Sequence, residues 1–257
     1  MQTIYRISDG GYKKLKLADK KICLESYLKA FPNVPLIIIC DNCHPETIQM
    51  VKEHTQCEII ETSLGNSGSF RKALEIALDY NDTVYLPEDD YVYNILSNKD
   101  LEQVVNEGIK IADYVTLYDH TDKYGKIYNF GEVSKVMRTS STHWKATIST
   151  TMTFAAMVET LKIDKKVWLK YTNENTPKDH ECFCELNRLV VSSIPGLSYH
   201  IDTTDECEDW VFEILSNEYK DQLGPLFPEF NYPETLARQL MIMRSLIYIM
   251  DQQITCK

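Results

Sequence analysis

Residues 65–90 read GNSGSFRKALEIALDYNDTVYLPEDD, and this stretch decides the fold. Its first part places apolar residues at helical spacing from Phe70 to Leu78, so we predict a helix over 67–80. The second part is apolar and aromatic until it reaches three consecutive carboxylates, and it predicts a strand over 83–90. A helix that leads into a buried strand is the repeating unit of a parallel sheet.

The same alternation runs through the rest of the first half of the chain. VPLIIIC (34–40) is a continuous apolar run, which is typical of a central strand covered on both faces. Further strands are expected at 3–8, 57–63 and 113–119, and helices at 18–31, 45–54 and 99–112. Several strand-helix units in succession predict an α/β fold with a Rossmann-like, doubly wound and mostly parallel sheet.

The pattern changes after about residue 119. Short strand-like runs at 131–139, 142–150 and 152–157 follow one another without helices, so we expect a small antiparallel element at the edge of the sheet. C-terminal helices are then expected at 157–170, 179–190 and 232–252. Since no linker or internal repeat interrupts the chain, we predict a single domain over 1–257, with halves 1–118 and 119–257.

The composition limits the class of partner. Lys and Arg total 27 against 38 Asp and Glu, which gives a net charge of −11. Nucleic-acid binding needs a basic face that neutralises phosphates, so we expect no nucleic-acid partner. The eight cysteines follow no repeating spacing and the N-terminus does not read as a secretory leader, so a cytoplasmic protein with reduced thiols is expected.

The apolar run LMIMRSLIYIM, from Leu240, is too short to span a bilayer and contains Arg244, so no transmembrane segment is expected. The helix that carries this run suits docking on the sheet, a dimer interface or peripheral contact with a membrane surface. Core packing is the commonest outcome for such a helix.

Polar residues follow four of the predicted strands at the point where each strand ends. Ser8 and Asp9 follow the first, Asp41 the second and Asn66 the third, and the triplet 88–90 follows the fourth. Ligands of open parallel sheets bind outside the carboxyl ends of the strands. An acidic triplet can be a solvated turn, but after a buried strand its like charges favour a divalent cation.

In the order of these motifs the chain resembles GT-A glycosyltransferases, especially the inverting family 2 type. In that family an Asn-x-Gly segment opens a helix, as at 66–68, and the next strand ends in an Asp-x-Asp type motif, as at 88–90. SSIPGLSYHID (192–202) is similar to a loop that returns a histidine to the metal in related sugar transferases. The chain departs from the family in Glu88, which stands where Asp is usual, and lacks the Gln-x-x-Arg-Trp of processive synthases.

The resemblance implies a metal-dependent enzyme that takes a sugar from a nucleoside-diphosphate donor, with UDP as the carrier expected from the family, and transfers it to a hydroxyl of a glycan or glycoconjugate. It implies that the residues that bind the donor are Ser8, Asp9, Asp41, Asn66, Arg71, Glu88 and Asp89. Among these, Asp41 would contact the base, and Asn66 and Arg71 would approach the pyrophosphate. Asp90 and His200 would bind the metal, which would be Mn²⁺ or Mg²⁺.

Inverting sugar transfer needs a carboxylate that deprotonates the acceptor hydroxyl. PKDHECF (177–183) supplies Asp179 and Glu181 after a polar loop that is suited to an acceptor cleft. Asp179 is equally suited to an ordinary helix N-cap, with Glu181 in the first turn. The resemblance favours Asp179 as the base, with Glu181 second.

Other motifs support competing interpretations. CDNC (40–43) has the spacing of a redox dithiol, although Cys40 is more simply a small core residue. HECFC (180–184) lacks the second ligand pair that a structural zinc site needs. Trp144 lies among hydroxyl residues and suits either a sugar platform or a packed hairpin.

Two functional alternatives stay open beside the transferase. A sugar nucleotidyltransferase also needs acidic metal ligands at strand ends, and SDGGYKKLK (8–16) partly fits its triphosphate loop. A non-catalytic carbohydrate-binding module is the alternative from another class, and it would not need the acidic triplet, the histidine and a separate carboxylate together.

Overall fold

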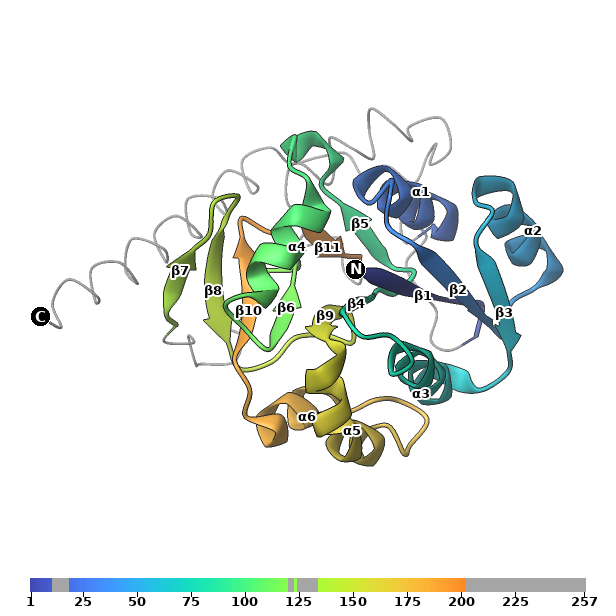
Figure 1. Ribbon diagram of the computed structural model, residues 1–257. Coiled ribbons are helices and arrows are strands. Elements are labelled where there is room, and N and C mark those ends of the chain that lie inside the picture. Colours follow the sequence, from blue (N-terminus) through green and yellow to red (C-terminus); the bar gives the residue numbers. More distant parts are fainter. Residues whose placement is uncertain (11–18, 120–122, 124–133, 202–257) are drawn as a thin grey trace, which may run out of the picture.

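The computed structural model describes residues 1–10, 19–119, 123 and 134–201. They form a nine-stranded mixed sheet with the order β3-β2-β1-β4-β9-β6-β10-β8-β7 (Figure 1). Its strands are β1 (Gln2–Ser8), β2 (Leu36–Asp41), β3 (Glu58–Thr62), β4 (Thr83–Leu86), β6 (Tyr114–Thr116), β7 (Val136–Arg138), β8 (His143–Thr147), β9 (Phe154–Met157) and β10 (Val190–Ile194). A separate antiparallel ribbon pairs β5 (Tyr91–Tyr93) with β11 (Ser198–His200).

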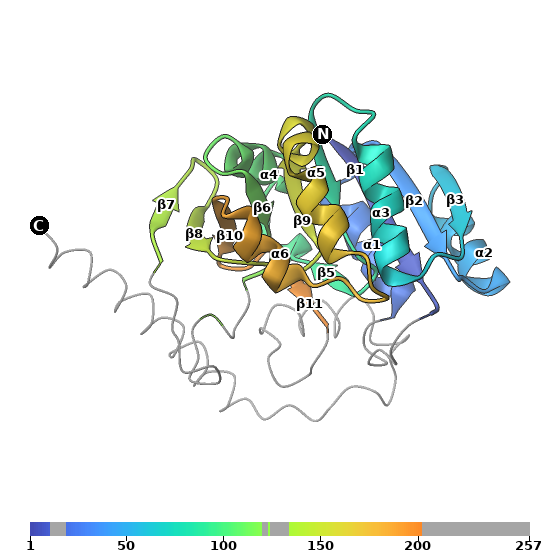
Figure 2. The same ribbon diagram turned by 90° about the horizontal axis from the view of Figure 1, so that it is seen from below.

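Helices cover both faces of the sheet (Figures 1 and 2). One face carries α1 (Lys20–Ala30), α2 (Pro45–His54) and α4 (Leu101–Ile109), and a 3-10 turn, η1 (Ile95–Ser97), precedes α4. The other face carries α3 (Gly65–Ala77), α5 (Val158–Tyr171) and α6 (Asp179–Leu186). Each face has its own apolar cluster, around Tyr27 and Trp144 on the first and around Phe70 and Trp168 on the second. The predicted doubly wound α/β fold is confirmed.

Local sequence signals explain where the first helices begin. The Asp19 carboxylate accepts the N–H groups of Lys21 and Ile22, which caps α1. Pro45 is the first residue of α2, at a position where a missing N–H costs nothing. Both predicted helices are therefore confirmed to within a few residues.

The antiparallel element is only partly at the edge. β7 and β8 extend the sheet beyond β10 as expected, but β9 lies between β4 and β6 and is antiparallel to both. Its residues, FAAM, are small or apolar and three of the four are buried, so they suit a central position covered on both faces. The expectation that all three short strands lie at the edge was wrong for β9.

A strand was also missed near the end of the described chain. The predicted helix over 179–190 stops at Leu186, because Asn187 adopts a left-handed conformation with φ 48° and ends it. VVSSI then forms β10, which is parallel to β6 and buried throughout. The predicted helix over 232–252 lies outside the described residues. Among those described, no helix combines the length and apolarity needed to cross a membrane.

Candidate functional site

The carboxyl ends of β1 and β4 meet around Arg6, a buried arginine that the sequence analysis did not select. Its guanidinium donates to Glu88 Oε1 at 2.8 Å and to Asn66 Oδ1 at 3.1 Å, and it lies over the Phe70 ring. The Arg6 side chain is only 5% exposed. Arg6 therefore joins the first carboxylate of the acidic triplet to the start of α3, and it neutralises Glu88.

The second and third carboxylates turn into the protein. Asp89 is 3% exposed, and its Oδ2 accepts the Ser8 N–H at 2.9 Å. Asp90 is 4% exposed, and its Oδ2 lies 3.5 Å from Nε2 of His200, which β11 brings back to β5. The structure thus brings Ser8 to Asp89 and His200 to Asp90, each across a long stretch of sequence.

The Tyr91 ring packs against the His200 ring. The two rings stack with their centroids 4.8 Å apart and an interplanar angle of 14°. The Tyr91 hydroxyl lies 2.5 Å from the Thr151 hydroxyl. Burial, and then the negative charges of Glu88 and Asp90, raise the pKa of Tyr91 well above its usual value, so the hydroxyl stays protonated. The imidazole is therefore held by a rigid, neutral partner.

Asp41 lies at the end of β2 but faces the protein rather than an open site. Its Oδ1 accepts the Thr62 hydroxyl and the Leu64 N–H, and its Oδ2 accepts the Gly65 N–H and the Asn42 amide. These bonds engage the lone pairs of a carboxylate that is 1% exposed, and they stabilise the start of α3. This geometry gives Asp41 a role in holding the loop and does not favour direct contact with a nucleobase.

Asp9 directly follows β1 and contacts the starts of α1 and α2. Its Oδ2 accepts the His44 N–H at 2.7 Å, and its Oδ1 lies 3.0 Å from Lys20 Nζ. Partial burial raises the pKa of Asp9, but the hydrogen bonds from His44, Thr47 and Lys20 outweigh it, and the pKa is lowered. Asp9 is therefore a stably ionised carboxylate at the rim of the site.

The two predicted pyrophosphate contacts separate in the structure. Asn66 is exposed at the start of α3, and its side-chain oxygen meets Arg6. Arg71 instead donates to the Thr172 hydroxyl at 3.1 Å and to the Leu169 carbonyl at 2.7 Å, which ties α3 to the end of α5. The arginine that adjoins the acidic triplet is thus Arg6 rather than Arg71.

Asp179 and Glu181 lie in the first turn of α6. Asp179 is half-buried, and burial, with a smaller contribution from the Glu181 charge, raises its pKa above the usual value. Its Oδ1 accepts the adjacent His180 N–H at 2.7 Å, which resembles a cap. Glu181 is exposed. A raised carboxyl pKa is a property of a general base as well as of a buried cap, so both interpretations of Asp179 persist.

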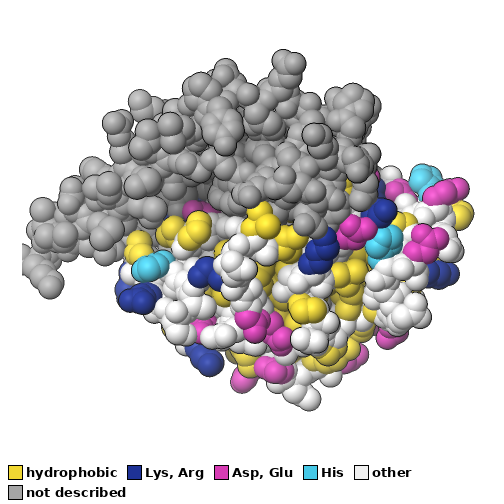
Figure 3. Space-filling view, turned by 90° about the horizontal axis from the view of Figure 1, so that it is seen from above, with side chains coloured by type: hydrophobic (Ala, Val, Ile, Leu, Met, Phe, Trp, Pro, Cys, Tyr) yellow, Lys and Arg dark blue, Asp and Glu magenta, His cyan; other side chains and the backbone are white. Residues whose placement is uncertain are grey.

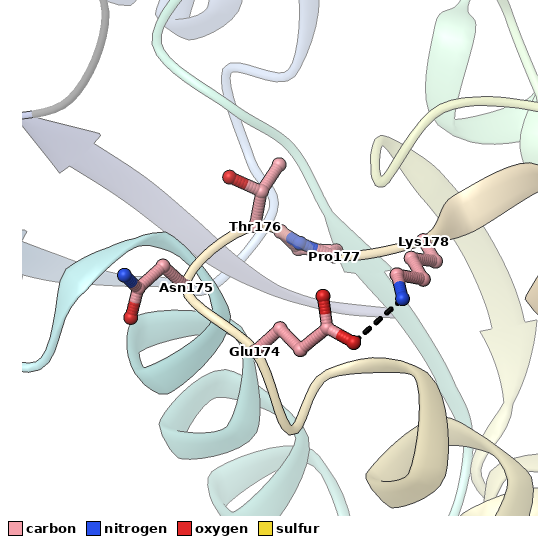
Figure 4. Close-up of a pocket in the computed structure, with 5 residues that line it drawn as sticks. All are labelled: Glu174, Asn175, Thr176, Pro177 and Lys178. Atoms are coloured by element: carbon pink, nitrogen blue, oxygen red, sulfur yellow. Dashed lines mark hydrogen bonds and ion pairs between the residues drawn. The ribbon is translucent and has the colours of Figure 1, made fainter.

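A cavity of about 590 Å³ lies directly before α6 (Figure 4). The five residues that line it are Glu174, Asn175, Thr176, Pro177 and Lys178. Lys178 Nζ lies 2.6 Å from Glu174 Oε1 in this loop, and the Asn175 carbonyl accepts the Ser67 N–H of α3. The cavity is lined by charged and polar residues together with Pro177, and it adjoins both the start of α3 and Asp179.

A segment with four hydroxyl residues out of five, Ser149–Thr153, connects the two sides of the site. The Thr153 hydroxyl donates to Glu88 Oε2 at 3.4 Å, Thr151 meets Tyr91, and Ser149 Oγ lies 3.0 Å from Nδ1 of His180. We call this run the hydroxyl segment.

A buried ion pair lies further along the same sheet edge. Lys145 Nζ is 3.4 Å from Asp119 Oδ1, and the Ser192 hydroxyl donates to the same oxygen. Lys145 is 1% exposed and Asp119 is 7% exposed. The sequence signal for this pair is Lys145, a charged residue in the middle of a strand. Its partner, Asp119, follows a strand that is distant in the sequence, so the pairing could not be predicted.

The geometry also bears on the sugar-platform, redox-dithiol and zinc-site interpretations. Trp144 is fully buried and donates to the Thr139 hydroxyl, so it is a packed residue and not an exposed sugar platform. Cys40 is buried at the end of β2, and the Cys43 thiol donates to the Ile7 carbonyl. His180 and Cys184 are in contact, but within the described residues no group of three or more His, Cys, Asp or Glu side chains is arranged to hold a metal.

The surface charge agrees with the composition. On the face of Figure 3, Lys and Arg side chains are interspersed with Asp and Glu, so the described surface visible there has no continuous basic patch.

No protein-family model matches the chain, and no curated protein sequence matches it. Solved structures resemble its fold at low identity. Residues 1–349 of TarS from S. aureus are 14% identical over 95% of this chain and 73% of that chain, with a TM-score of 0.48. A nucleotide-diphospho-sugar transferase from Desulfovibrio desulfuricans is 12% identical over 95% and 99%, with a TM-score of 0.47. The 4-diphosphocytidyl-2C-methyl-D-erythritol synthase from Anaerococcus prevotii is 14% identical over 82% and 93%, with a TM-score of 0.43.

Proposed function

We propose that this protein is a metal-dependent, inverting glycosyltransferase of the GT-A type, which transfers a sugar from a nucleoside-diphosphate donor to a hydroxyl of a glycan or glycoconjugate. The observation that carries the proposal is the pair of adjacent, almost fully buried carboxylates, Asp89 and Asp90, with His200 3.5 Å from Asp90. Adjacent carboxylates at a strand end, with an imidazole beside one of them, are the oxygen and nitrogen ligands that a divalent cation takes.

Asp90 and His200 fit a metal site in which the protein supplies only part of the coordination shell. Their 3.5 Å separation suits two ligands of one ion, and a carboxylate with an imidazole suits Mn²⁺ as well as Mg²⁺. Such ions are commonly held by one or two protein ligands and completed by substrate phosphates and water. When bound, the ion would stabilise the charge that develops on the departing nucleoside diphosphate.

The donor would be held at the rim of the same edge. Asp9 is ionised there, and the Ser8 N–H fixes Asp89. Glu88 is oriented by Arg6 and lies close to the ribose and sugar in this proposal. Because Asp41 is engaged by the α3 loop, the preference for uridine rests on the family resemblance alone, and GDP and dTDP donors are equal candidates in a test.

The acceptor would enter from the side of α6. The cavity at 174–178 offers charged and polar side chains that could hydrogen-bond a hydroxyl-rich molecule. Asp179 follows this loop directly, and its raised pKa suits the removal of a proton from the attacking hydroxyl. Glu181 is the second candidate for this role.

Thermal unfolding tests the donor site first. The protein is heated with UDP, GDP or dTDP, each with Mn²⁺ or with EDTA, and one diphosphate should raise the Tm only when Mn²⁺ is present. Saturation at a hundredfold excess over Kd corresponds to about 2.7 kcal/mol of stabilisation. Asp90→Asn and His200→Asn should abolish the Mn²⁺-dependent part, whereas His54→Asn, at the far end of α2, should retain it.

A nucleotidyltransferase would behave differently. Its candidate triphosphate loop begins at Ser8 and continues through 11–16, which lie outside the described residues. It should be stabilised by a nucleoside triphosphate in preference to a diphosphate, and it should release pyrophosphate when a sugar phosphate is added. Stabilisation by none of these nucleotides would instead favour a non-catalytic carbohydrate-binding module.

A further inference from the structure

We infer that His180 is a positioning residue that acts through Asp179, and that its contact with Ser149 sets the place of the catalytic carboxylate. The inference rests on the proposed function, because it takes Asp179 to be the base. It extends that function by adding a pair of residues, Ser149 and His180, that neither the motifs nor the family resemblance assigns.

His180 is exposed in the first turn of α6, yet one edge of its ring is fixed. Its Nδ1 lies 3.0 Å from Oγ of Ser149, which is itself only 5% exposed. The same Oγ accepts a hydrogen bond from Lys123 Nζ at 3.0 Å. A surface histidine that is held by a buried hydroxyl has lost the rotamer freedom that such a side chain normally keeps.

The two ring nitrogens of His180 meet different parts of the chain. Nε2 lies 3.6 Å from the sulfur of Cys184, which belongs to the same helix. Nδ1 meets Ser149, which lies outside the helix. The Ser149 contact is therefore the one that ties the His180 ring to the rest of the site.

The ring contact matters because the backbone of His180 holds Asp179. Asp179 Oδ1 accepts the His180 N–H at 2.7 Å, so a shift of His180 moves the hydrogen-bond donor that orients the carboxylate. Ser149 lies at one end of the hydroxyl segment, whose Thr151 meets Tyr91 and whose Thr153 meets Glu88. The Ser149–His180 contact thereby fixes the first turn of α6 relative to the residues of the proposed metal and donor site.

Release of nucleoside diphosphate from sugar nucleotides tests this role without a known acceptor. In the reaction, water attacks the anomeric carbon, the bond to the pyrophosphate oxygen breaks, and Asp179 takes the proton of the water. UDP-glucose, GDP-mannose and dTDP-glucose serve as probes, with Mn²⁺ present. The variants are Ser149→Ala, His180→Ala and His180→Asn, with Cys184→Ala as the matched control on the other side of the ring.

Ser149→Ala and His180→Ala should each lower kcat about tenfold, since a 1 Å misplacement of a catalytic group can cost about a hundredfold and loss of this contact should cause a smaller shift. The double variant should be no worse than either single one, because both remove the same contact. KM for the sugar nucleotide should stay unchanged, Cys184→Ala should match the wild type, and His180→Asn should recover part of the loss through its side-chain amide.

The decisive comparison is made in an Asp179→Asn background. If His180 acts through Asp179, His180→Ala should cause no further loss there. An equal loss in both backgrounds, or a loss that appears in KM and in Mn²⁺-nucleotide binding, overturns the inference while leaving the proposed function intact. If the wild-type protein releases no diphosphate from any of the probes and binds no diphosphate with Mn²⁺, the proposed function itself fails.

Discussion

At the scale of single residues, Arg6 compensates the charge of the first carboxylate of the acidic triplet. It is the buried cation that meets Glu88, and the pair is joined to Asn66 through the same guanidinium. Arg6→Met should lower the free energy of unfolding by about 3 kcal/mol, because removal of one partner leaves a carboxylate uncompensated in a poorly solvated place. Urea unfolding monitored by circular dichroism measures the change.

A double variant separates the ion pair from simple packing. Met keeps most of the apolar contact of Arg6 with Phe70, and Glu88→Gln removes the charge that Arg6→Met leaves behind. Arg6→Met combined with Glu88→Gln should therefore be more stable than Arg6→Met alone. If the two losses simply add, the Arg6–Glu88 pair does not carry the effect and the explanation is wrong.

Asp179 gives a prediction about pH at the same scale. Its pKa is raised in the folded protein, by burial first, from an unfolded value near 3.8. The folded state therefore holds its proton to higher pH than the unfolded state, and stability falls as the pH rises from the unfolded to the folded pKa. Asp179→Asn should be more stable than the wild type near neutral pH, and the difference should shrink on acidification below the folded pKa.

Thermal unfolding of both proteins from about pH 4 to about pH 7 measures this difference. Asn keeps an oxygen that can accept the His180 N–H, so the substitution tests the charge rather than the cap. Glu181→Gln, which removes an exposed charge in the same turn, is the control and should show little of the effect. A constant difference across the pH range would contradict the prediction.

At the scale of elements, the alternating half of the chain could be predicted because each helix and strand there carries its own periodicity and its own ends. Asp19 and Pro45 mark helix starts through local chemistry that needs no tertiary contact. β9 and β10 could not be predicted in the same way. FAAM is too short to reveal whether its neighbours are central or peripheral strands, and the pairing of β9 with β4 and β6 is set by distant residues.

The packing of α4 on the sheet gives a prediction for one glycine. A Cβ on Gly108 would lie 2.9 Å from the Trp144 ring and 2.9 Å from Val115 Cγ1, closer than side-chain atoms normally approach. Gly108→Ala should gain about 1 kcal/mol of helix propensity but lose about 1–3 kcal/mol to overpacking, so the net change should be destabilising.

Urea unfolding of Gly108→Ala checks this sign. Asn106→Ala, on the same helix and only half-buried, is the matched control and should be neutral or slightly stabilising. Trp144→Phe removes the part of the ring that the new methyl group would meet, so it should reduce the cost of Gly108→Ala in the double variant. A stabilising Gly108→Ala would show that the helix moves away from Trp144 at little cost.

At the scale of the whole molecule, the sequence predicted which strand ends come together better than it predicted the contacts of the side chains there. The strand-end rule places Ser8 and the triplet at one edge because that follows from the topology alone. Arg6 was missed because a buried cation inside a strand reads as an exposed residue until its partners are known. Asp41 and Arg71 were selected as donor contacts by resemblance, whereas their side chains bind the α3 loop and the end of α5.

The strand order of the sheet predicts which backbone amides exchange their hydrogens slowly and which exchange them fast. β9 lies between β4 and β6 and its middle residues are fully buried, whereas β3 and β7 are edge strands with exposed residues. Amides of Ala155 and Ala156 should therefore exchange as slowly as those of β1 and β4, at the free energy of global unfolding. Amides of β3 and β7 should exchange faster, through local opening. If β9 were instead an edge strand, as the sequence pattern suggested, its amides would exchange as fast as those of β7. The exchange rate at Ala155 therefore distinguishes one continuous core across both halves of the chain from a core confined to the first half.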